Sequence, residues 1–205
     1  MSPSELAAAH ARLVDGAATL RLGRAQDLPF EDASIDVVLC HMAIMLMSPI
    51  EPVLAEIARV LKPGGRFAAV IGMWGAPEDA DAACLQALRA ALSEEHVASS
   101  MKGLGDLRFR SEEGLKGLFD ATPDLQGTFQ LMPIELELRC PVERMVSDYT
   151  LLYPIELLTE GAQDRLKQNY RDAVAPWVDE SGRVLSRSRL ALFSVERTTP
   201  VTATP

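Results

Sequence analysis

Two short apolar runs on either side of one amphipathic stretch constrain the fold of this chain more than any other feature. Residues 35–40 (IDVVLC) and 66–72 (RFAAVIG) are nearly continuous in aliphatic and β-branched side chains, as expected for strands covered on both faces of a parallel sheet. The stretch between them carries one apolar stripe at helical spacing and ends at the stop signal of residues 62–65 (KPGG). Strand, helix and strand with short joints predict a right-handed parallel crossover, and therefore an α/β fold.

Helix signals recur along the rest of the chain. Ser2, Pro3 and Glu5 have the chemistry of an N-cap, a first helical proline and a capping-box glutamate, which predicts a helix at the start of the chain. Apolar residues at helical spacing predict a second helix that runs from Leu85 toward His96. Three more helices are predicted over residues 111–119, 141–151 and 159–177.

Three further strands are predicted from alternation and β-forming residues. Residues 18–23 (ATLRLG) form a short alternating run bounded by glycines. Residues 134–139 (IELELR) alternate strictly, so Glu135 and Glu137 are expected on one solvated face. Residues 190–195 (LALFSV) predict a late strand, and the neighbouring Arg187 and Arg189 are interpreted as edge-strand charges.

The composition limits the partners and the compartment. A chain of 205 residues with 48% apolar residues predicts a single domain over residues 1–197, and the Thr- and Pro-rich residues 198–205 predict a disordered tail. The net charge of −9 repels polyphosphate, so nucleic acid is not expected as a partner. The three cysteines have no metal-ligand spacing, and no apolar run reaches the roughly 20 residues that cross a bilayer. We therefore expect a cytoplasmic protein with reduced thiols, no bound metal and no membrane span.

Three segments in order carry a resemblance to a known family. Residues 23–30 (GRAQDLPF), 36–41 (DVVLCH) and 54–65 (LAEIARVLKPGG) together resemble the class I S-adenosylmethionine-dependent methyltransferases of the small-molecule type. The resemblance is close over residues 1–72 and holds only in outline beyond them. It implies a doubly wound, Rossmann-like sheet, mostly parallel with an antiparallel late strand, in which the cofactor lies across the carboxyl ends of the strands.

The resemblance also assigns residues to the cofactor S-adenosylmethionine. The loop that cups the adenine in that family matches Arg24, Ala25 and Gln26, although the family often has an acidic residue where this chain has Arg24. The end of the fourth family strand, which contacts the methionine part, matches Cys40, His41 and Met42. Residues 73–125 and 139–187 match the variable regions that close over the acceptor, and four aromatic residues there are candidate lid residues: Trp74, Tyr149, Tyr153 and Trp177.

One family feature has no match in this sequence. Family members begin with a strand, a glycine-rich turn, a helix and a second strand that ends in an acidic residue which binds the ribose. The chain therefore resembles an amino-terminally truncated member with the first two strands missing, a unit of roughly 30 residues or more. The opened sheet would be closed by contact between the remaining strands, by dimerisation or by aggregation, because its exposed ladder groups need partners.

Two functional hypotheses follow from the resemblance. The first is a methyltransferase for a small-molecule acceptor, which would be inactive as it stands if the missing stretch is essential. In this hypothesis His41 acts as a base or orients an acceptor hydroxyl. The alternative for His41 is a histidine that packs and forms hydrogen bonds near the cofactor. The second hypothesis is a degenerate interaction or dimerisation module without cofactor binding. Because the sulfonium leaving group is already charged, methyl transfer needs alignment more than acid–base chemistry, so no triad or metal cluster is expected.

Overall fold

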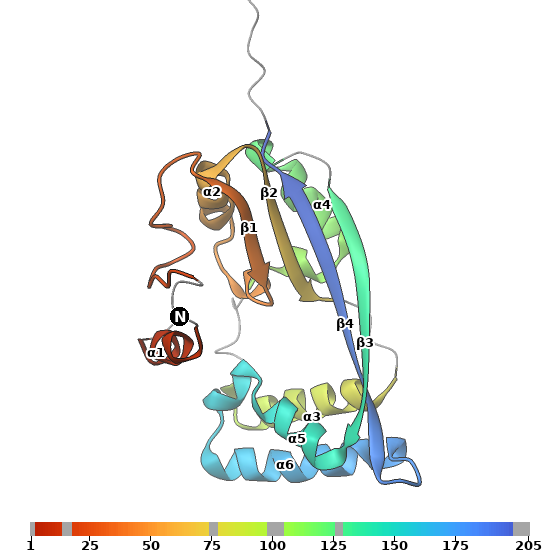
Figure 1. The fold of residues 1–205 in the computed structure, drawn as a ribbon. Helices are drawn as coiled ribbons and strands as arrows, with labels where there is room; N and C mark the ends of the chain where they lie inside the picture. The colour runs from red at the N-terminus through yellow and green to blue at the C-terminus, as the bar shows by residue number, and fades with distance from the viewer. Residues whose placement is uncertain (1–2, 14–17, 74–77, 98–104, 126–128, 199–205) are drawn as a thin grey trace, which may run out of the picture.

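A computed structural model describes residues 3–13, 18–73, 78–97, 105–125 and 129–198, and it is built around one mixed β-sheet (Figure 1). The sheet has four strands in the order β1-β2-β4-β3. Strands β1 and β2 run parallel, whereas β4 is antiparallel to both β2 and β3. The four strands are β1 (Ile35–His41), β2 (Leu61–Gly72), β3 (Gln130–Pro141) and β4 (Arg183–Glu196).

The predicted crossover is confirmed. Strand β1 leads through helix α2 (Glu51–Val60) into β2, and Val38 of β1 lies in register with Phe67 of β2. Helix α2 ends at Val60 because the next residue already has extended backbone, so the KPGG segment begins strand β2 rather than a loop. Gly65 is needed in this segment, since a Cβ atom there would lie 2.8 Å from the carbonyl oxygen of Lys62.

A first hydrophobic core covers one face of the sheet near β1 and β2. Helix α2 contributes its apolar stripe, and helix α4 (Glu112–Asp120), which begins after the N-cap Ser111, contributes Leu115, Leu118 and Phe119. Phe193 of β4 lies at the centre, with its ring centroid 5.6 Å from that of Phe67 and 5.3 Å from that of Phe119. This core ties the parallel and antiparallel parts of the sheet to one helical layer.

A second core lies at the other end of the long strands β3 and β4. It is formed by α3 (Ala80–Glu94), α5 (Val142–Thr150) and α6 (Glu160–Val174), which pack with Val184 and Cys140 of the strands. Val184 lies in the second core, whereas Ala191, Phe193 and Val195 lie in the first. Because side chains alternate along a strand, the two cores cover opposite faces of the sheet. Helices α3, α5 and α6 form a layer at that end of β3 and β4, beyond the carboxyl end of β1 (Figure 1).

Two sequence predictions about the sheet need correction. Residues 18–23 are not a strand: between α1 (Pro3–Arg12) and β1, the described residues have only an isolated bridge between Arg24 and Asp27. A strand needs a neighbour for its backbone groups, and no described strand flanks β1 on that side. The sheet is also less parallel than predicted, since only one of its three strand pairs is parallel.

The third correction concerns the arginines near the last strand. Strand β4 lies between β2 and β3 and is not an edge strand. Arg189 instead forms an ion pair with the buried Asp79 at 2.9 Å, and Arg187 pairs with Glu137 at 2.8 Å. Glu135 and Glu137 are exposed on one side of β3, as predicted, and they are bound by these arginines.

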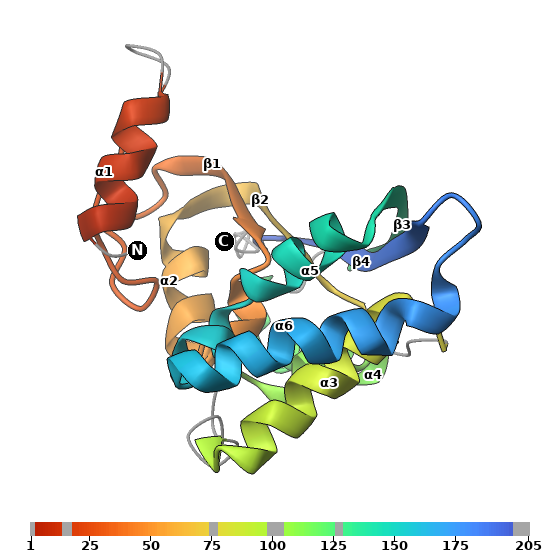
Figure 2. The same ribbon diagram turned by 90° about the horizontal axis from the view of Figure 1, so that it is seen from below.

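Part of one sheet face remains uncovered among the described residues. Leu39 of β1 is 78% exposed, and the side chains of Val37, Met132, Leu136 and Leu138 are each more than half exposed. By strand register these residues lie on one face of the sheet. The second core covers this face only near Cys140 of β3 and Val184 of β4. Helix α1 lies beyond the outer edge of β1 in both views (Figures 1 and 2).

None of the helices in the described ranges is long and apolar enough to cross a membrane. The predicted lid residue Trp74 and the end of the predicted tail, residues 199–205, lie outside the described residues.

Candidate functional site

The carboxyl end of β1 holds three of the residues predicted to bind the cofactor. Cys40 packs against the first core, and burial raises the pKa of its thiol. His41 is the last residue of the strand, exposed, and on the opposite face from Cys40. Met42 follows with a φ of +52°, and its N–H donates to the carbonyl oxygen of Val70 at 2.8 Å. The left-handed region is costly for a residue with a side chain, and such strain is concentrated at functional sites.

The predicted adenine loop forms a tight turn. The N–H of Asp27 donates to the carbonyl oxygen of Arg24 at 3.1 Å. Ala25 is half-buried and packs against the first core, Gln26 is half-buried, and Arg24 is exposed. The turn therefore has one side fixed to the core, while the Arg24 side chain extends into solvent.

An ion-pair cluster on α2 fixes the loop that follows this turn. The carboxylate of Glu56 accepts a hydrogen bond from the N–H of Leu28 at 2.8 Å. Arg59 donates to Glu56, to the carbonyl oxygens of Leu28 and Phe30, and to Asp32. The Arg59 guanidinium, followed by the Leu28 amide, lowers the pKa of Glu56 to about 2. Two segments that are separate in sequence are joined at this cluster, namely the loop of residues 28–32 and α2.

We expect Glu56→Gln to lower the free energy of unfolding by about 1–2 kcal/mol at pH 6, because it removes a charged acceptor from Arg59 and Leu28. The pKa of Glu56 is lower in the folded chain than its ordinary value of 4.5, so its stabilisation is present above that value and is lost as the pH falls toward 2. Urea unfolding of both chains at pH 6 and pH 3 measures this, and the difference between them should shrink at pH 3.

Glu51→Gln is the matched control for this prediction. Glu51 lies on the same helix and pairs with Arg108 at 2.6 Å, but its side chain is 64% exposed. Loss of this ion pair should lower the free energy of unfolding less than the loss of Glu56 does, as is usual for an exposed ion pair. Equal effects of the two substitutions would contradict a specific anchoring role for Glu56.

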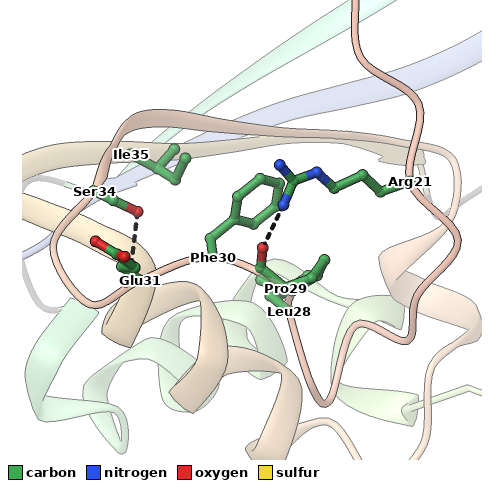
Figure 3. Close-up of a pocket in the computed structure, with 7 residues that line it drawn as sticks. All are labelled: Arg21, Leu28, Pro29, Phe30, Glu31, Ser34 and Ile35. Atoms are coloured by element: carbon green, nitrogen blue, oxygen red, sulfur yellow. Dashed lines mark hydrogen bonds between the residues drawn. The ribbon is translucent and has the colours of Figure 1, made fainter.

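A cavity of about 620 Å³ lies beside the same loop, lined by residues that include Arg21, Phe30 and Ser34 (Figure 3). The Arg21 guanidinium carbon lies 5.3 Å from the centroid of the Phe30 ring, and Arg21 donates to the carbonyl oxygen of Pro29 at 2.8 Å. Ile35, the first residue of β1, also lines this cavity, so it lies at the amino end of the strand. Ligands of open α/β sheets bind at the carboxyl ends, so this hollow is not the predicted cofactor site.

A second cavity, of about 420 Å³, lies between the second helical layer and the sheet. Asp81 of α3 is buried on its wall and accepts hydrogen bonds from the Tyr149 hydroxyl at 2.8 Å, the Ser186 hydroxyl at 2.9 Å and the Arg187 N–H at 2.6 Å. Burial, followed by the charge of Asp81, raises the pKa of Tyr149. Tyr149 was a candidate lid residue; Ser186, Ser188 and Asp81 were not predicted.

Two other candidate lid residues are not placed at this cavity. Trp177 ends the short helix η6 (Ala175–Trp177), is 42% exposed and does not line this cavity. The side chain of Tyr153 lies outside the described residues. Within the described ranges, no cluster of three metal-ligating side chains occurs.

The amino-terminal third of the chain is similar in sequence to known methyltransferases. A model of the methyltransferase domain family matches residues 1–69. Over 49 residues the chain is 53% identical to a demethylmenaquinone methyltransferase of Symbiobacterium thermophilum. These 49 residues are 24% of this chain and 20% of that protein. Over 57 residues it is 44% identical to the uncharacterized methyltransferase YcgJ of Bacillus subtilis, covering 28% of this chain and 22% of the relative. The chain thus spans about a fifth of the length of these curated relatives.

A solved structure extends the likeness in fold to most of the chain. The crystal structure of YcgJ from Bacillus subtilis matches with a TM-score of 0.50 at 18% identity, over 86% of this chain and 70% of that one. The fold of this chain is therefore similar to that of this structure, and residues 1–69 are similar to the methyltransferase domain family.

Proposed function

We propose that this chain forms all or part of an S-adenosylmethionine-dependent methyltransferase that acts on a small-molecule acceptor. The family match over residues 1–69 carries this proposal, because that stretch contains both the Arg24–Gln26 turn and the carboxyl end of β1. The similarity to a demethylmenaquinone methyltransferase supports a small molecule as the methyl acceptor. We also propose that residues 1–197 act as one domain, since β4 contributes side chains to both cores.

The residues present fit the two ends of the cofactor. S-adenosylmethionine supplies a methyl group on a positively charged sulfur. The half-buried Ala25 and Gln26 offer a platform fixed to the core for the adenine. At the end of β1, the backbone from Cys40 to Met42 would hold the methionine part, and the strained Met42 turns the chain away from the strand. The ribose has no matching carboxylate, so we expect the affinity of this chain to be low.

His41 is the proposed catalytic residue. It is exposed at the carboxyl end of β1, on the face opposite the half-buried Cys40, where an acceptor could reach it. An imidazole in this position could take the proton of an acceptor hydroxyl or hold that hydroxyl in line with the methyl group. Binding of S-adenosylhomocysteine, the demethylated cofactor, tests the cofactor part of the proposal without knowledge of the acceptor.

A second candidate function is dimerisation through the open edge of the sheet. Strand β1 has no partner on its outer side among the described strands, and the apolar Val37 and Leu39 are exposed beside that edge. An unpaired edge is a template for pairing with another strand. We propose a second copy of this chain as the partner, because two β1 strands related by a two-fold axis would pair antiparallel and bring their Leu39 side chains to one shared face.

We expect Leu39→Lys to convert a dimer into a monomer, because it places a charge on the shared apolar face. Light scattering coupled to size-exclusion chromatography measures the mass of each species. Leu151→Lys is the matched control, since Leu151 is 80% exposed at the end of α5, away from the sheet. A monomeric parent chain, or a dimer that both variants preserve, would overturn the proposed pairing.

A further inference from the structure

The cavity beside the second core has the size and walls of a small-molecule site. Its volume of about 420 Å³ lies in the range of ligand pockets, which are mostly apolar with a few polar groups. Its apolar lining comes from three elements, α3, β3 and the end of α5, and consists of Leu85, Leu136, Leu138 and Leu152. Leu136 and Leu138 are each more than half exposed, so they are available to a ligand.

The polar side of the cavity is formed by the carboxylates of Asp81 and Asp148 and by the hydroxyl groups of Tyr149, Ser186 and Ser188. The carboxylate of Asp81 receives three described hydrogen bonds, two at Oδ1 and one at Oδ2. A carboxylate can accept about four hydrogen bonds, so Oδ2 can accept one more. All three described donors are uncharged groups, the hydroxyls of Tyr149 and Ser186 and the backbone N–H of Arg187. None of the three donors therefore brings a positive charge to the carboxylate beside the apolar walls.

The charges around the cavity determine which ligands it accepts. Asp148 also lines the cavity and is paired with Arg144 on the same helix at 2.8 Å. The nearby guanidinium groups are bound to other carboxylates, with Arg187 on Glu137 and Arg189 on Asp79. An anionic ligand would meet an uncompensated carboxylate, whereas a hydroxyl group could donate to it.

The cavity is also placed for a role in methyl transfer. The layer of α3, α5 and α6 lies on the side to which the carboxyl end of β1 points (Figure 1). That edge of an open α/β sheet is where ligands bind. The cavity is thus on the same side of the molecule as His41, whereas the hollow at the amino end of β1 is not.

We propose that this cavity binds the methyl acceptor, an uncharged and largely apolar molecule that presents a hydroxyl group to Asp81. The identification of the ligand as the acceptor rests on the proposed function, but the chemistry of the ligand is derived from the cavity alone. Asp81 also joins α3 to α5 and β4 through its hydrogen bonds, so its substitution would disturb the fold. The test therefore substitutes an apolar residue that lines the cavity.

Three probes with the same ring system test the predicted selectivity. The probes are 2-naphthol, 2-methoxynaphthalene and 2-naphthoate, and their binding to the full chain is followed by fluorescence titration without cofactor. We expect 2-naphthol to bind at least tenfold more tightly than the methoxy compound, which cannot donate, and 2-naphthoate to bind more weakly still. Equal affinities for the three probes would overturn the proposed hydroxyl recognition.

A matched pair of variants locates the binding. Leu136 and Met132 lie on the same face of β3 and are 55% and 57% exposed, but only Leu136 lines the cavity. We expect Leu136→Gln to weaken 2-naphthol binding at least fivefold and Met132→Gln to leave it unchanged. Equal effects of the two would place the binding on the open sheet face and overturn the proposal. S-adenosylhomocysteine is titrated separately. Naphthol binding without cofactor binding would contradict cofactor binding by this chain and leave the ligand chemistry of the cavity intact. Cofactor binding without naphthol binding would overturn only the cavity proposal.

Discussion

Replacement of Phe193 by alanine should lower the free energy of unfolding by about 3–5 kcal/mol, the range for loss of a fully buried aromatic side chain. Phe193 is completely buried, and its ring lies beside four other aromatic rings, those of Phe67, Phe109, Phe119 and Phe129. The centroids of Phe67 and Phe119 lie within 6 Å of its own, and that of Phe109 lies at 6.4 Å. The substitution would leave a cavity between β2, β4 and α4.

Urea unfolding followed by circular dichroism measures this effect. Phe30→Ala is the matched control, because Phe30 is 41% exposed and its ring lies under the exposed Arg21 guanidinium. We expect the control to cost less than about 1 kcal/mol, the upper end for an exposed cation–π contact. A loss below 1 kcal/mol for Phe193→Ala would mean that the first core does not hold the two parts of the sheet together.

The local pattern of the sequence predicted the elements of the first core well. Helix α2 and strand β2 follow directly from the apolar stripe and the aliphatic run. The prediction that these strands are covered on both faces was wrong, because alternate residues of β2 are exposed or half-buried and Leu39 of β1 is 78% exposed. The alternation of residues 134–139 likewise marked β3, although the strand extends several residues further at its amino end. These elements are determined by short-range patterns, and short-range patterns are visible in one sequence.

Strand pairing was less predictable because it depends on distant neighbours. Residues 18–23 have strand-like alternation but no described strand beside them, and they remain unpaired except near Arg24. Arg189 has no local signal for an ion pair, since Asp79 lies 110 residues away. Whether a charge is on an edge or buried is decided by the order of strands in the sheet, which no local pattern contains.

The candidate site contains residues that the sequence could predict and residues that it could not. Residues 40–42 and 24–26 were selected by resemblance, and in the structure Cys40 packs half-buried against the first core while His41 is exposed. The alternation of a strand could have separated these two residues in advance. By contrast, Asp81 and Ser186 are 105 residues apart, so their hydrogen bond depends on the packing of α3 against β4. Only the folded chain brings that pair together.

Calorimetric titration with S-adenosylhomocysteine should give a Kd weaker than 1 µM for this chain, corresponding to less than about 8 kcal/mol of binding free energy. The expected weakness has a physical cause: no glycine-rich turn or ribose carboxylate matches this sequence, so only the adenine and methionine ends would be held. A Kd of 1 µM or tighter would contradict this account and would mean that another arrangement replaces those contacts.

Arg24→Glu should strengthen this weak binding about three- to tenfold, since one hydrogen bond contributes on the order of 1 kcal/mol. The resembling family often has an acidic residue at this position, where a carboxylate can accept from the adenine amine. Arg24 is exposed, so the substitution should not disturb the core. Arg12→Glu makes the same charge change on an exposed helical residue and should leave the affinity unchanged. Stronger binding by the Arg24 variant alone would support the adenine turn and the methyltransferase proposal, whereas absence of binding by all three folded chains would favour the dimerisation module.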